Sequence, residues 1–209
     1  MRFFSYDSAF MTALRRLVDH ILLGIVWIVM SLPVFTIGAA TTAMLFAAED
    51  SIRKEGGRIL PTFWRCFRRE FRQATLLWLL AAVLLAVLAC DIFVLFTAVL
   101  PGFLKFILSA VVVFVFSWIQ LWFGYLAKFQ DTNRVLLHNT IRIVIGSLPK
   151  ALLLSIISFC AIAGMIYCFL LLPPFTLVIP GIYGMLSMRI LSWIFKKYLP
   201  PAEDVPADA

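Results

Sequence analysis

Asp91 is the most unusual residue of this 209-residue sequence, because it interrupts an otherwise uncharged stretch between Ala74 and Leu104. An aspartate in such a stretch is costly inside a membrane and usually faces protein or water. It lies ten residues before Pro101, about 15 Å away along a helix, and Lys105 follows the same proline. Direct pairing of Asp91 with Lys105 would be strained, and the lysine can instead extend outward. Two roles stay open for this intramembrane polar site: handling of a proton or substrate, or a protonated structural carboxyl.

Other residues capable of catalysis are few and poorly placed. Asp19 and His20 are adjacent, and adjacent helix positions do not face each other, so a catalytic dyad is not favoured. Cys160 and Cys168 lie eight residues apart on one expected helix, about 12 Å in rise, which is too far for a disulfide. We interpret the four cysteines as small core residues. Because no phosphate-binding loop of the G-x-x-x-x-G-K-[ST] type occurs either, we expect neither an enzyme nor a resident metal or cofactor.

The composition is that of a membrane protein. Residues of the AVILMFWYC set make up 63% of the chain and charged residues 14%, against roughly 45–50% and 25% in soluble domains. We expect one all-α domain over residues 1–209, a polytopic bundle with about five spans of roughly 20 apolar residues. The spans are expected at about 17–34, 74–99, 103–127, 151–172 and 175–195. Pro101-Gly102 and Pro173-Pro174 separate successive spans, because proline ends helices.

The uncharged stretch 21–48 fits either one tilted helix or a helix with a partial return. Basic residues flank it on both sides, and the positive-inside rule places both flanks in the cytoplasm. We therefore expect a bend at 33–38 and a short return helix at about 39–50, packed inside the bundle. This topology puts both termini and 17 of the 18 basic residues in the cytoplasm, Lys105 being the exception. The net charge of +7 is then a topology signal, which requires no nucleic acid and also suits anionic lipid head groups.

We expect cytoplasmic segments at 50–73 and 128–150 and a C-terminal tail at 196–209. The two segments contain amphipathic patterns that a simple connection between spans does not need. Over residues 61–72, aromatic residues recur at helical spacing and predict an amphipathic helix at the membrane interface. Arginines fill the other face: Arg65, Arg68, Arg69 and Arg72. In the second segment, Asn139 and Arg142 accompany apolar residues in a similar way. Both helices could simply fix topology and cover the bundle, or they could dock a partner.

A stripe of small residues marks the expected return helix. Gly38, Ala39, Ala43 and Ala47 recur at about one-turn spacing, which lets helix backbones approach closely. The stripe could pack inside the subunit or contact another membrane protein.

Longer segments resemble a known family. They are FFSYDSAF (3–10), LVDHILLGIVWIVMSLPVFTIGAATTAM (17–44), PTFWRCFRREFRQATLLW (61–78), YLAKFQ (125–130), HNTIRIVIGSLPKALLL (138–154) and IFKKY (194–198). Together they resemble the YesL-like, or DUF624, family over essentially the whole chain. The most specific part is the bend motif, composed of Ser31, Pro33, Thr36 and Gly38. The sequence departs from many relatives at Gly24, where they carry Asn, and at Gly124, where they carry Pro.

The resemblance implies a bacterial plasma-membrane protein often encoded with carbohydrate importers of the ATP-binding-cassette (ABC) class. We therefore expect a non-catalytic accessory or regulatory protein that binds the importer's permease or ATPase through helices 61–72 and 133–146. The alternative is a small-solute-binding membrane subunit that borrows a partner ATPase, with Asp91 facing a pocket open to the outside. The position and polarity of a pocket would separate these two functions.

Overall fold

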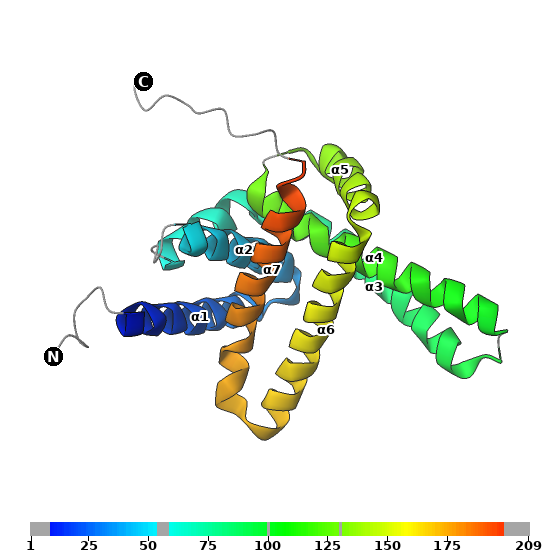
Figure 1. Cartoon of the computed structure of the whole chain (residues 1–209), viewed down its shortest axis with the longest axis horizontal. Helices are drawn as coiled ribbons and strands as arrows, with labels where there is room; N and C mark the ends of the chain where they lie inside the picture. The colour runs from blue at the N-terminus through cyan, green and yellow to red at the C-terminus, as the bar shows by residue number, and fades with distance from the viewer. Residues whose placement is uncertain (1–8, 54–58, 100, 130, 199–209) are drawn as a thin grey trace.

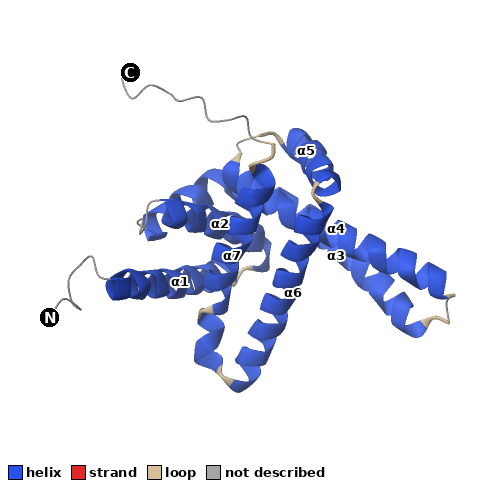
Figure 2. Cartoon of the chain, viewed as in Figure 1, coloured by secondary structure: helices blue, strands red, loops and turns tan. Residues whose placement is uncertain are grey.

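Every regular element that the structure describes is a helix. The computed structural model describes residues 9–53, 59–99, 101–129 and 131–198, and in these ranges it is all-α (Figure 2). The α-helices are α1 (Ala9–Ser31), α2 (Ile37–Arg53), α3 (Ile59–Thr97), α4 (Gly102–Lys128), α5 (Asn133–Gly146), α6 (Leu148–Leu171) and α7 (Ile179–Phe195). Two short 3-10 helices, η1 (Val34–Thr36) and η2 (Pro173–Leu177), precede α2 and α7. The predicted all-α class is confirmed for the described ranges.

Four helical segments are long and apolar enough to cross a membrane: α3, α4, α6 and Phe175–Phe195. The apolar part of α1, Val18–Ser31, is shorter, and a crossing needs about 20 residues. The side chains of the four segments agree with a lipid environment, because large apolar residues near the helix ends, such as Phe96 and Phe103, are exposed. These segments mark a multi-pass membrane protein.

The structure joins two elements that the sequence analysis kept apart. Residues 61–72 and the expected span 74–99 form one continuous helix, α3, of 39 residues. No proline or glycine occurs between Thr62 and Thr97, so nothing interrupts the backbone hydrogen bonds. At 1.5 Å per residue α3 is about 58 Å long, nearly twice the roughly 30 Å hydrocarbon core. The expected separate helix is therefore wrong, because residues 61–72 continue directly into the long apolar part of α3.

The long helices diverge from a shared centre instead of standing parallel as in a simple bundle. In Figure 1 the α3–α4 pair extends to the right, the α6–α7 pair extends downward and α1 reaches to the left. The α5 helix lies at the top, beside the end of α4. At the centre, α2 packs mainly on α3, and α1 packs mainly on α7. The fully buried side chains gather here, among them Leu23, Met44, Leu77, Trp122 and Met188.

The small-residue stripe packs inside the chain. Ala39, Ala43 and Ala47 are buried, and a side chain at Gly38 would stand 2.6 Å from Trp78 Cβ and 2.7 Å from the Ala74 carbonyl oxygen of α3. Small residues therefore let α2 lie directly against the backbone of α3.

A second close approach joins α1 to α7 through two glycines. A side chain at Gly24 would collide with the carbonyl oxygen of Leu177, and one at Gly181 would collide with that of His20. Gly24 of α1 thus faces the backbone at the end of η2, just before α7, and Gly181 of α7 faces the backbone of α1. Gly24, one of the two departures from the family pattern, is the position that allows this crossing.

Candidate functional site

The bend motif closes the turn between α1 and α2. The buried Thr36 side chain lies where its hydroxyl can donate to the carbonyl oxygens of Met30 at 2.5 Å and Pro33 at 2.6 Å. Met30 lies in the last turn of α1, where carbonyl groups lack partners within the helix, and the Pro33 carbonyl also accepts the backbone N–H of Thr36 at 2.9 Å. Gly38 lies where α2 first contacts α3. The hydroxyl of Ser31 is buried and has no hydrogen-bond partner among the described residues. The motif therefore serves as a structural bend in this chain.

Asp91 and Lys105 lie on the facing sides of α3 and α4, but no described ion pair joins them. Both side chains are half-buried. The rings of Trp78 and Phe123 meet at 6.4 Å, which sets an antiparallel register that places Asp91 about one turn deeper than Lys105. The two residues therefore lie at different levels of the helix pair, and no described hydrogen bond or ion pair joins them into a shared polar site.

The amino-terminal half of α3 has one buried aromatic face and one exposed basic face. Phe63 and Phe67 are buried, toward the α2 helix that packs along α3. The opposite face, here called the arginine ridge, is exposed and consists of Arg65, Arg68, Arg69 and Arg72. Arg69 binds the buried Glu70 carboxylate through Nε at 2.6 Å, and its guanidinium lies over the Phe46 ring. The other three arginines form none of the described ion pairs.

Asn139 is not available for docking, contrary to what we expected for the segment 128–150. Its side-chain amide is half-buried and donates to the Tyr125 hydroxyl at 2.9 Å. Tyr125 in turn donates to the Asp131 carboxylate at 2.5 Å, and Gln73 Nε2 donates to the Asp131 carbonyl at 2.7 Å. Asn139 therefore helps to hold α5 against α3 and α4 and is not free for a partner, whereas Arg142 is exposed.

A further ion pair and a cation–π contact connect the ends of three helices. Lys128 Nζ lies 3.1 Å from Glu49 Oε1 and 5.9 Å from the centre of the Phe195 ring. It thereby joins α4 to α2 and α7, so it is an internal contact of this face.

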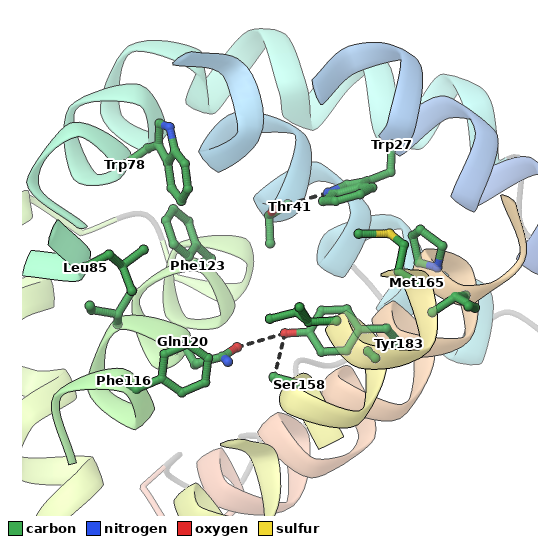
Figure 3. A pocket seen from close by; sticks show the side chains of 15 residues that line it. Trp27, Thr41, Trp78, Leu85, Phe116, Gln120, Phe123, Ser158, Met165 and Tyr183 are labelled. Atoms are coloured by element: carbon green, nitrogen blue, oxygen red, sulfur yellow. Dashed lines mark hydrogen bonds between the residues drawn. The ribbon is translucent and has the colours of Figure 1, made fainter. Parts of the chain in front are cut away.

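A cavity of about 270 Å³, here called the hub cavity, occupies the centre from which the helix pairs diverge. Six helices line it, with residues that include Trp27, Thr41, Trp78, Gln120, Ser158 and Tyr183 (Figure 3). Aromatic rings form much of its wall, and its lining contains no charged side chain. Asp91, the residue expected to face a solute pocket, is not part of it.

Two hydrogen-bonded groups lie on opposite walls of the hub cavity (Figure 3). On one wall, the Tyr183 hydroxyl donates to Gln120 Oε1 at 2.8 Å, and Ser158 Oγ lies 3.1 Å from the same hydroxyl. On the other, Trp27 Nε1 donates to Thr41 Oγ1 at 3.2 Å. The Gln120 amide nitrogen makes no hydrogen bond within the described ranges. The cavity therefore combines apolar walls with an uncommitted donor.

The described residues offer no cluster suited to a metal ion. They contain no cluster of three or more His, Cys, Asp or Glu side chains able to hold a metal ion. Asp19 accepts a hydrogen bond from Ser51 Oγ at 3.4 Å, which links α1 to α2. The four cysteines are free thiols in this structure, and only Cys66 is buried.

Comparison with known proteins identifies part of the chain. Residues 21–92 match the family model described as a protein of unknown function, DUF624. These residues are a DUF624 segment. The predicted resemblance is confirmed over this segment. No curated protein and no solved structure matches the chain.

The DUF624 segment ends within the outer half of α3. It contains the bend motif, the arginine ridge and Asp91, and it supplies Trp27, Thr41 and Trp78 to the hub cavity. The polar trio on the opposite wall, Gln120, Ser158 and Tyr183, lies beyond it. Sequence analysis missed this trio because it searched the apolar stretches for charged residues, although an uncharged polar residue there also signals a contact inside the protein.

Proposed function

We propose that this protein is a non-catalytic accessory or regulatory subunit of an ABC-type carbohydrate importer, with its docking surface on the cytoplasmic side. The observation that carries the proposal is the exposed arginine ridge of α3. Arg65, Arg68 and Arg72 are exposed together on one side of a well-packed helix, and none of them takes part in an ion pair between residues that the structure describes.

The burial of Phe63 and Phe67 favours docking over lipid anchoring. An interfacial anchor needs an apolar face that can enter the head-group region. Here that face is largely occupied within the chain, with Trp64 the large exposed exception at 41%. What remains outward is a row of guanidinium groups, whose planar forks match carboxylates or phosphates on a partner.

The proposal includes the topology inferred from basic residues. It has α1 as a fifth span that starts in the cytoplasm, α2 as a return helix inside the fold, and both termini on the cytoplasmic side of a bacterial plasma membrane. Burial of the small-residue stripe supports an internal α2, because irregular or short elements at membrane depth must be covered by protein. Arg142 on α5 is a further exposed arginine, which the inferred topology places on the same side.

The alternative function, a solute-binding subunit that borrows an ATPase, finds less support in the hub cavity. A carbohydrate would bring many hydroxyl groups, each of which costs free energy when buried without a partner. The cavity is lined mostly by apolar and aromatic side chains and does not include Asp91. A regulatory role is therefore the function we favour.

Co-purification from the native host tests the docking surface. The variant carries Arg65→Lys, Arg68→Lys and Arg72→Lys, which keeps the charge but removes the bidentate forks. We expect the importer's permease or ATPase to copurify with the wild type and recovery to fall at least tenfold in the variant, since each good contact contributes roughly 1 kcal/mol.

The control is Arg189→Lys, an exposed arginine on α7. Equal recovery of importer subunits with the triple variant would overturn arginine-specific docking. Failure of the wild type to bring down any importer subunit would overturn the proposed function itself.

A further inference from the structure

The hub cavity lies among the candidate membrane-spanning helices and opens toward their outer surface. Its walls come from the helices that could span the bilayer, together with α1 and α2. Ile162, one of the lining residues, is 46% exposed, so the cavity reaches the outer surface of α6. A molecule dissolved in the hydrocarbon core would meet this opening directly.

The lining specifies an uncharged ligand. No charged side chain lies on the cavity wall, and a buried charge without a partner is too costly for such a site. Its volume of about 270 Å³ lies near the lower end of ordinary ligand pockets, about 300–1,000 Å³. It therefore suits one ring system and not a whole phospholipid or an oligosaccharide.

The aromatic walls and the hydrogen-bond donors of the hub cavity further restrict the chemical class of a ligand that fits it. Trp78, Phe116 and Phe123 present ring surfaces to the cavity, and rings pack well against the faces or edges of other rings. The Gln120 amide oxygen accepts from Tyr183, which fixes the orientation of the amide, and its nitrogen donates to none of the residues that the structure describes. On the opposite wall, Thr41 Oγ1 accepts from Trp27, which leaves its hydroxyl proton to donate. Donors on both walls match a ligand with acceptor oxygens.

We propose that the hub cavity binds the ring of an uncharged, lipid-soluble carbonyl compound of the quinone type. The ring lies among the aromatic side chains, and its carbonyl oxygen accepts a hydrogen bond from the Gln120 amide. This binding site is separate from the cytoplasmic docking surface and does not depend on the proposed importer partnership.

A pair of alanines on α6 provides a matched test. Ala161 lines the cavity, whereas Ala163 is an exposed residue of the same helix that does not line it. The probe is 2-methyl-1,4-naphthoquinone, added to the purified full chain in detergent. Its binding is measured as saturable quenching of tryptophan fluorescence and as a rise in melting temperature.

We expect saturable binding to the wild type and to Ala163→Phe, and a loss of at least tenfold in affinity for Ala161→Phe. Gln120→Leu, which keeps the approximate volume and removes the donor, should weaken binding about tenfold. This second variant keeps the test decisive if Ala161→Phe does not fold, as judged by size-exclusion chromatography.

Three results would overturn the proposal. They are absence of saturable binding to the wild type, equal effects of the two phenylalanine variants, and unchanged affinity in Gln120→Leu. Displacement of the probe by an equal concentration of diacylglycerol would also overturn it, because the cavity would then be a general cleft for lipid chains.

Discussion

A methyl group added at Gly24 should destabilise the fold by separating α1 from α7. The added Cβ would collide with the Leu177 carbonyl oxygen and stand 3.0 Å from its carbonyl carbon, with the backbone nitrogen of Gly181 3.4 Å away. These are backbone atoms of the opposing segment, so no side-chain rotation relieves the overlap. The two segments must move apart, which weakens the packing around the crossing.

The expected size of the effect follows from that overlap. Carbon atoms in good contact lie about 3.5–4.0 Å apart, and overpacking of this kind typically costs about 1–3 kcal/mol. Alanine favours a helix over glycine by up to about 1 kcal/mol, which offsets part of the cost. A net loss of about 1–2 kcal/mol remains, equivalent to roughly five- to thirtyfold in the folding equilibrium.

Thermal unfolding of the purified protein in detergent measures this loss, and Gly102→Ala is the matched control. At Gly102, the first residue of α4, an added Cβ meets no atom within 4 Å. We expect Gly24→Ala to melt several degrees below the wild type and Gly102→Ala to melt at or above it. If the two variants melt alike, the close approach of α1 to α7 does not exist in the protein.

Three further substitutions test other parts of the structure. Thr36→Val should lower the unfolding free energy by about 1 kcal/mol, because it removes a buried hydroxyl from the bend; Thr97→Val, at an exposed hydroxyl, should have no effect on the melting curve. Tyr125→Phe should speed backbone hydrogen exchange in α5, because it removes the shared partner of Asp131 and Asn139, whereas Tyr167→Phe, at an exposed ring, should not. Asp91→Asn should leave membrane insertion and melting temperature unchanged or improved; reduced growth on an oligosaccharide with normal stability would contradict its structural role.

The helix boundaries could largely be predicted from local chemistry. Pro33, Pro101 and the pair at 173–174 each lie where one helix gives way to the next in the structure, because proline ends helices through its missing N–H and fixed φ. The continuity of α3 was missed for the opposite reason. The basic surface of residues 61–72 gives way to an apolar surface further along the helix, and this change suggests a boundary between two elements. A helix ends, however, only where its backbone hydrogen bonding is interrupted or capped.

The aromatic face of α3 and the α5 helix show what the sequence leaves open. The pattern around Phe63 and Phe67 specifies an apolar face but not what covers it, so lipid and α2 were equally compatible with it. Asn139 likewise reads as a surface residue within α5. Only the position of Tyr125, fourteen residues earlier on another helix, makes it part of an internal network.

The hub cavity could not be predicted from the sequence, because its polar residues lie at different distances from the proline turns that precede or follow them in the chain. Counted at 1.5 Å per residue, Gln120 lies about 28 Å from the Pro101 turn, while Ser158 and Tyr183 lie about 22 Å and 13 Å from the Pro173-Pro174 turn. In parallel helices with level ends, these side chains would occupy three separate depths. They meet because the α3–α4 and α6–α7 pairs diverge, which brings different levels of each helix to the common centre (Figure 1). The divergence of the α3–α4 and α6–α7 pairs is therefore what assembles the polar wall of the cavity.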